Sequence, residues 1–257
     1  MSWNIFSRLT SPKKAPPVIT KEEEKAFERE VNKISVLDEA TKKLYKDMKH
    51  CIEAMGALSK SQCRIGQNLA ASPILNTEES LKNLELISKS IGQIESKTQE
   101  LNASSMRTMV EPMKKFSTIF PSLYMALKKR EQCLQEYSRC QGKVEKYQDR
   151  ERTGPNLAKL EASKKNLAAA KEEYDRQHTE LMQAMPQFFE GRVEYFQPSF
   201  EALIKSQVIY YTECFKIYAE LAVQLGDNDT LQSDEDFEMD LHRRLCEIRA
   251  LSIVVDD

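Results

Sequence analysis

A column of apolar residues at strict seven-residue spacing runs through the last third of the chain. Its members are Leu160, Leu167, Tyr174, Leu181, Phe188 and Tyr195. Such spacing keeps one stripe of a helix against a partner helix over many turns, which is typical of a coiled coil. The column therefore predicts a long helix that packs along other helices.

Apolar residues recur every three or four positions in three stretches of the chain, which predicts three helices. The first begins at Thr20 and ends at Ser72-Pro73, the second runs from near Thr77 to Thr153-Gly154-Pro155, and the third ends at Gly226. Only 7 glycines and 9 prolines interrupt 257 residues, fewer turn residues than a sheet protein needs. The prediction is an all-α antiparallel bundle with helices of about 50, 77 and 73 residues.

The start of the first helix has its own signature. Thr20 is followed three residues later by Glu23, which is the spacing of a capping box.

Prolines inside the predicted helices bear on the shape of the bundle. Pro112 and Pro121 fall in the second helix, and Pro186 and Pro198 fall in the third. Each could end a helix, but the apolar spacing continues past them, so we predict kinks in continuous helices. The apolar faces of such a long curved bundle cannot all be covered within one monomer, which predicts a homodimer.

The amino-acid composition indicates in which cellular compartment the protein resides and which classes of protein are excluded. Hydrophobic residues make up 40% and the mean hydropathy is -0.57, with no apolar stretch that approaches the length of a membrane span. The first twenty residues lack the pattern of a secretory signal, and the six cysteines form no CxxC pair. We therefore expect a cytoplasmic protein with reduced thiols.

The domain organisation follows from changes in composition along the chain. Residues 1–19 contain three prolines and no acidic residue, and we expect a flexible arm. Residues 20–226 form the helical domain. Residues 227–257 form an acidic tail, in which residues 241–255 are compatible with a short helix that binds either a partner or the bundle.

Charge is segregated along the chain. Residues 128–171 contain twelve Lys/Arg against six Asp/Glu, whereas residues 226–257 contain three Arg against ten Asp/Glu. Such segregation suggests a basic working surface, although an ordinary solvated face is the alternative. The basic set is Lys128, Lys129, Arg139, Lys143, Lys146, Arg150, Arg152, Lys159, Lys164 and Lys165. Arg130 is set apart, because it falls in an apolar column, where pairing inside the bundle is the alternative to surface contact.

The N-terminal arm contains a small amphipathic segment. Trp3, Ile5, Phe6 and Leu9 fall within about 160° of arc if the segment is helical. Ser11-Pro12 limits such a helix to about ten residues, too few for stable isolated helicity. The segment either inserts into a membrane as a helix formed on lipid, or remains disordered or folds back on the bundle.

An enzymatic function has little support in the sequence. Neither a phosphate-binding loop, a dinucleotide motif nor a serine-hydrolase motif occurs. A di-metal bundle needs two Glu-x-x-His pairs, and the chain offers only Asp47-x-x-His50 and Asp175-x-x-His178. We predict no catalytic residue, no metal, no cofactor and no nucleic-acid partner.

Two stretches resemble the BAR-domain (Bin/amphiphysin/Rvs) family over roughly residues 20–226. Residues 109–137 carry a proline, a Phe-Pro pair and a basic pair before a leucine and a tyrosine. These are Pro112, Phe120-Pro121, Lys129-Arg130, Leu134 and Tyr137. Residues 180–213 carry the matching Pro186, Phe188, Arg192 and Tyr195.

The resemblance implies a crescent-shaped BAR dimer of long, kinked, three-helix antiparallel coiled coils. It further implies binding to anionic bilayers, with sensing or induction of membrane curvature, and the basic set would then contact lipid headgroups. It also implies peripheral membrane and actin-cytoskeleton association, actin-regulatory partners, and links to septation and cytokinesis. The alternative is a coiled-coil cytoskeletal adaptor that does not bend membranes.

Overall fold

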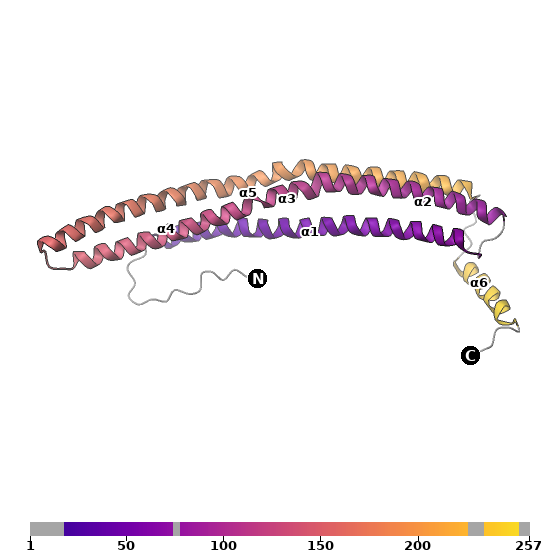
Figure 1. Cartoon of the computed structure of the whole chain (residues 1–257), viewed down its shortest axis with the longest axis horizontal. Helices are drawn as coiled ribbons and strands as arrows, with labels where there is room; N and C mark the ends of the chain where they lie inside the picture. Colours follow the sequence, from indigo (N-terminus) through magenta and orange to yellow (C-terminus); the bar gives the residue numbers. More distant parts are fainter. Residues whose placement is uncertain (1–17, 74–77, 226–233, 252–257) are drawn as a thin grey trace. The chain divides into compact units, whose positions relative to one another are not determined.

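The computed structural model describes residues 18–73, 78–225 and 234–251, and the regular elements in these ranges are all helical (Figure 1). In chain order they are α1 (Lys21–Ala71), α2 (Glu78–Ser105), the π-helical turn η1 (Met106–Val110), α3 (Glu111–Ser117), α4 (Ile119–Gln148), α5 (Gly154–Gln224) and α6 (Asp234–Arg249). The prediction of an all-α fold with long helices is confirmed.

α1 begins with the predicted capping box. The backbone N–H of Thr20 donates to Glu23 Oε2 at 2.8 Å, and the backbone N–H of Glu23 donates to Thr20 Oγ1 at 3.1 Å. These bonds satisfy two donors that a helix start leaves without partners. The backbone N–H and the hydroxyl of Thr20, which both donate to the Glu23 carboxylate, hold the pKa of Glu23 below its ordinary value. The N-terminal boundary of α1 is thus encoded locally.

α5 is continuous through both of its prolines, Pro186 and Pro198, as predicted. The second predicted helix is different. Between α2 and α3 the backbone widens into η1, where the N–H of Glu111 donates to the carbonyl of Met106. Pro112 follows directly, and a wider turn relieves the clash between its ring and the carbonyl four residues earlier.

A second interruption separates α3 from α4. The N–H of Thr118 donates to the carbonyl of Lys115, only three residues back, and Pro121 lies in the first turn of α4. The predicted kinks at Pro112 and Pro121 thus coincide with departures from α-helical hydrogen bonding, but the second helix is divided into α2, α3 and α4 rather than continuous. Apolar spacing reports which side of the chain is buried, and it does not report a local change in backbone hydrogen bonding.

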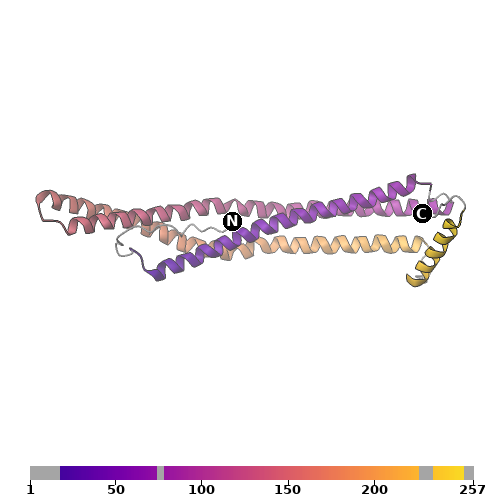
Figure 2. The ribbon, with the colours of Figure 1, turned by 90° about the horizontal axis from the view of Figure 1, so that it is seen from below.

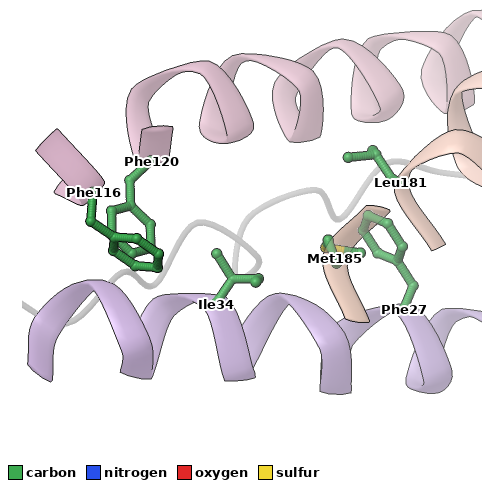
Figure 3. Close-up of a cluster of buried hydrophobic side chains, with 6 residues drawn as sticks. All are labelled: Phe27, Ile34, Phe116, Phe120, Leu181 and Met185. Atoms are coloured by element: carbon green, nitrogen blue, oxygen red, sulfur yellow. The ribbon is translucent and has the colours of Figure 1, made fainter. Parts of the chain in front are cut away.

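The chain consists of two compact units. Unit 1 comprises the described residues of Met1–Ala57 and Gln99–Val208, and unit 2 those of Leu58–Thr98 and Ile209–Asp257. In unit 1, four helices contribute to one hydrophobic cluster, whose side chains point toward one another (Figure 3). Its buried members are Phe27, Ile34, Phe116, Phe120, Leu181 and Met185. The ring of Phe116 also stacks on Phe188 with centroids 5.0 Å apart.

Beyond the start of α1, α4 and the first turns of α5 continue side by side as a helical hairpin (Figures 1 and 2). In unit 2, α2 and α5 are joined by the hydroxyls of Thr98 and Tyr210, 3.1 Å apart, and Cys63 of α1 donates to Glu95 of α2. α6 belongs to unit 2 and has no buried residue.

The first turns of α1 are held in unit 1 by a buried cation. Arg130 of α4 is 1% exposed, and its guanidinium donates to both carboxylate oxygens of Glu24, at 2.8 and 3.2 Å. It also donates to the Tyr174 hydroxyl of α5 at 2.9 Å and lies 4.1 Å from the ring centroid of Phe27. The alternative in which Arg130 pairs inside the bundle is therefore the one observed.

The electrostatics of this cluster favour a charged arginine beside a neutral histidine. Burial by itself would lower the pKa of Arg130, but the hydrogen bonds and charge of Glu24 and Tyr174 raise it above its usual value. The ring of His178 stacks on Tyr174 at 5.5 Å and lies the same distance from Phe27. Burial and the charge of Arg130 lower the pKa of His178.

Glu24→Gln should destabilise the fold by about 3 kcal/mol, because it leaves the buried Arg130 with only the more distant carboxylate of Glu131, 3.8 Å away. This value is the lower end of the destabilisation expected when a buried ion pair is broken, because the Glu24 side chain is 26% exposed. Urea unfolding at fixed protein concentration measures the change. Glu22→Gln, in the same turn and exposed, is the matched control. Equal losses in the two variants would show that the ion pair contributes nothing.

Stability should fall as the pH drops below about 6.5, the ordinary pKa of histidine. Because the folded pKa of His178 is lowered, the unfolded chain binds the proton more tightly in the window between 6.5 and the folded pKa. His178→Phe keeps the ring stack and should flatten this part of the stability profile, whereas His50→Gln on the exposed side of α1 should not. If His178→Phe left the dependence of stability on pH unchanged, the assignment of this dependence to His178 would be contradicted.

Candidate functional site

The basic set predicted from the sequence lies on the hairpin of α4 and α5, and all of its members are exposed. This region, residues 128–171, is called the basic hairpin below. It belongs to unit 1, and the buried Arg130 and Tyr174 lie at its base.

Part of the set forms a stripe along α4. Arg139, Lys143 and Lys146 are separated by four and three residues, which places them within about 60° of arc on a helix. The side chain of Lys128 projects from α4 in the same direction as these three. The stripe faces away from the buried side of α4, which is marked by Arg130 and Val144. Its cations are therefore presented to solvent on one side.

Several members of the set are already paired with carboxylates. Arg139 donates to both oxygens of Glu136, at 2.6 and 2.7 Å, and this hydrogen bonding lowers the pKa of Glu136. Lys129 lies 3.6 Å from Glu173. Lys164 lies 3.3 Å from Glu161. In the described ranges the other members, namely Lys128, Lys143, Lys146, Arg150, Arg152, Lys159 and Lys165, have no carboxylate within ion-pair distance.

The lysines on α5 do not extend the α4 stripe as one face. Lys159, Lys164 and Lys165 point in directions that span about 220° around the helix. The structure thus brings together the α4 residues of the predicted set and spreads those of α5.

A shallow groove of about 480 Å³ runs between α4 and α5 on the basic hairpin. Cys133, Cys140, Ala169 and Ala170 line it together with charged residues of both signs. Burial and a hydrogen bond to Glu136 raise the pKa of the Cys140 thiol, which disfavours the nucleophilic thiolate. Within the described ranges, the side chains include no cluster of three metal-binding residues.

α5 also exposes a line of large apolar side chains. In unit 1 these are Val193, Phe200, Ile204 and Val208, and in unit 2 they are Tyr211, Phe215 and Tyr218. Phe215 is 73% exposed. The apolar residues of this helix differ in burial. The structure separates them, with Tyr210 and Cys214 buried and Tyr211 and Phe215 exposed.

Two further observations concern membranes. Trp3, Ile5, Phe6 and Leu9 lie outside the described residues, so the structure does not bear on the amphipathic arm. Of the helices in the described ranges, none combines the length and apolarity that crossing a bilayer requires.

A second group of lysines was not anticipated from the sequence. Lys42, Lys43, Lys46 and Lys49 are exposed on α1. The close spacing of these lysines in the sequence could have indicated a basic patch. However, Glu39 and Asp47 lie among them and reduce the local excess of positive charge. Only the packing of α1 against α3 places Lys42 near Lys114, in one pocket.

Comparison with known proteins agrees with this architecture. A family model described as BAR domain matches residues 18–227. Bridging integrator 3 of Mus musculus is 43% identical over 258 residues, covering all of both chains. The Candida albicans protein named regulator of cytoskeleton and endocytosis RVS161 is 28% identical and covers 86% of each chain. The Drosophila amphiphysin BAR domain superposes with a TM-score of 0.67 at 17% identity, covering 84% of this chain and 98% of its own. The chain therefore belongs to the BAR domain family.

Proposed function

We propose that this protein is a non-enzymatic, homodimeric scaffold that binds anionic bilayers through the basic hairpin and senses or induces their curvature. The observation that carries the proposal is the solvent-facing stripe of Arg139, Lys143 and Lys146, continued by Arg150 and Arg152 at the end of the hairpin. Anionic headgroups attract cations held at such a surface.

The expected strength of this binding is modest. Each cation near an anionic surface contributes about 1 kcal/mol, so three per hairpin in a dimer give about 6 kcal/mol. That free energy corresponds to a Kd on the order of tens of micromolar before salt screening. Reversible recruitment, strengthened by dimerisation and by several dimers acting together, follows from such a value.

The exposed apolar line on α5 supports the homodimer. Large exposed apolar surfaces on soluble chains mark contact sites, and Ile204, Val208 and Phe215 are each at least 60% exposed. A second copy is the occupant that the family membership favours.

The cellular setting is proposed from the relatives. The name of the Candida albicans relative refers to the cytoskeleton and to endocytosis. We extend this setting to the present chain as a cytoplasmic, peripheral membrane role near actin, with actin-regulatory partners and a part in septation and cytokinesis.

Reversing Lys143, Lys146 and Arg150 to Glu should weaken co-sedimentation with phosphatidylserine vesicles at least about tenfold, because cations at the surface are replaced by anions. Reversal of Lys60, Lys82 and Lys89, which are exposed on α1 and α2, changes the net charge by the same amount and is the control. Binding by the unmodified protein should weaken as salt rises. Equal binding by both triple variants would remove the basic hairpin from the site.

Phe215→Glu should shift the protein from dimer to monomer in analytical ultracentrifugation, because it buries a charge in the apolar contact. Helicity by circular dichroism should stay unchanged, since Phe215 is exposed within the chain. Lys216→Glu, on the neighbouring exposed position, should leave the dimer intact. A Phe215→Glu protein that dimerises normally would exclude this part of α5 from the interface.

A cytoskeletal adaptor that does not bend membranes is the second candidate. α6 favours it, because Phe237, Leu241, Leu245 and Ile248 follow one side of a helix without buried residues. An adaptor and a membrane scaffold differ in the vesicle experiment, because only the scaffold binds lipid with a strong salt dependence.

A further inference from the structure

α6 (Asp234–Arg249) carries an apolar stripe that stays exposed in unit 2. The side chains of the stripe fall within about 80° of arc on the helix. They are Phe237, Leu241, Leu245 and Ile248, each between 42% and 57% exposed. No residue of α6 is buried. A continuous apolar stripe on a helix is the surface through which helices pack together, so the stripe of α6 is a candidate contact surface.

The charges of α6 are divided between its two halves. Residues 234–240 contain five carboxylates and no cation, whereas residues 241–249 contain three arginines and one carboxylate. In a parallel pair of α6 helices, the two acidic halves would lie side by side and repel each other. In an antiparallel pair, each acidic half lies beside the arginine-bearing half of the other copy. The charge distribution therefore favours an antiparallel partner with the sequence of α6 itself.

Part of this charge is already paired within the helix. Asp240 forms ion pairs with Arg243 and with Arg244, whose Nε lies 2.9 Å from Asp240 Oδ2, and these hydrogen bonds lower the pKa of Asp240. Glu238 and Arg249 differ, because no residue of α6 three or four positions away carries the opposite charge at neutral pH. In the described ranges neither has an ion-pair partner. Both charges are therefore available to another chain.

Glu238 and Arg249 flank the apolar stripe on the same side. Their directions around the helix differ by about 20°, but they lie about 16 Å apart along it, so they cannot pair within one helix. In an antiparallel pair, the same flank of each helix faces the other copy. When Phe237 of one copy lies opposite Ile248 of the second, Glu238 lies within about 3 Å, measured along the axis, of Arg249 of the second copy. That offset is within the reach of the two side chains.

We propose that α6 pairs with α6 of a second copy of this chain in an antiparallel arrangement, with the apolar stripes in contact and Glu238 of each copy beside Arg249 of the other. One copy holds only half of the contact, because each ion pair takes one residue from each chain. The contact is separate from the exposed apolar line on α5 and from the basic hairpin. A pair of 16-residue helices is short, so it forms where copies of the chain are concentrated.

Energy transfer between copies of the full chain labelled at Cys246 tests the pairing. Cys246 is exposed and points about 145° away from the centre of the stripe, and Cys51→Ser removes the other exposed cysteine. In mixtures of donor-labelled and acceptor-labelled protein, Glu238→Arg or Arg249→Glu should weaken the pairing about tenfold, because two attractions become two repulsions. The double reversal should restore the transfer, since both ion pairs form again with their signs exchanged.

Glu235→Arg is the matched control. It makes the same change of charge in the same helical turn as Glu238→Arg, but Glu235 points about 125° from the centre of the stripe, so transfer should change less than about twofold. Mixing Glu238→Arg protein with Arg249→Glu protein should also restore transfer. Transfer that neither single reversal lowers, or a loss that the double reversal does not recover, overturns the proposal. Those results are expected if α6 packs against its own α5 or binds a different protein.

Disulfide formation tests the direction of the pair. With Cys51 and Cys246 replaced by Ser, Phe237→Cys protein mixed with Ile248→Cys protein should form a mixed disulfide, because these positions face each other in the antiparallel pair. Each protein alone should form no disulfide through α6, since its two engineered thiols lie about 16 Å apart along the axis. Disulfides within each protein alone, without the mixed product, would show a parallel pair and overturn the proposal.

Discussion

The buried guanidinium of Arg130 is the interaction on which the packing of unit 1 depends. It joins α4 to the first turns of α1 through Glu24 and to α5 through the Tyr174 hydroxyl. A cation left in such a place without its carboxylate is strongly destabilising, so the three helices must remain together. Phe27 lies under the guanidinium and belongs to the hydrophobic cluster, which couples the polar contact to the apolar core.

The position of this contact also determines which surfaces are free. Because α1 begins at Lys21, just before Glu24, the described part of α1 does not extend along the basic hairpin (Figure 2). The long side chains of Lys143 and Lys146 therefore reach solvent from a two-helix segment. On the other side of the contact, α1 packs along α3 and creates the pocket with Lys42 and Lys114. The Arg130–Glu24 contact thus lies between the exposed basic hairpin and the part of unit 1 where α1 packs against α3.

Sequence reasoning was most accurate where the signal is local or strictly periodic. The capping box of Thr20 and Glu23 and the continuity of α5 through Pro186 were predicted and are observed. The η1 turn and the break at Thr118 were not, because a changed hydrogen-bond pattern leaves the apolar spacing intact. The pocket was missed as well, since Lys42 and Lys114 are far apart in sequence and each belongs to a mixed-charge segment.

The helical class, the approximate ends of the helices, the family and the concentration of basic residues in 128–171 could all be inferred from the amino-acid sequence. These properties depend on spacing and composition, which are written along the chain. The burial of individual apolar residues on α5 and the pairing of individual cations could not be inferred in this way. Those outcomes depend on neighbours that come from other helices, as Arg130 shows. Its charge resembles that of Lys143, but Glu24 and Tyr174 make it part of the core.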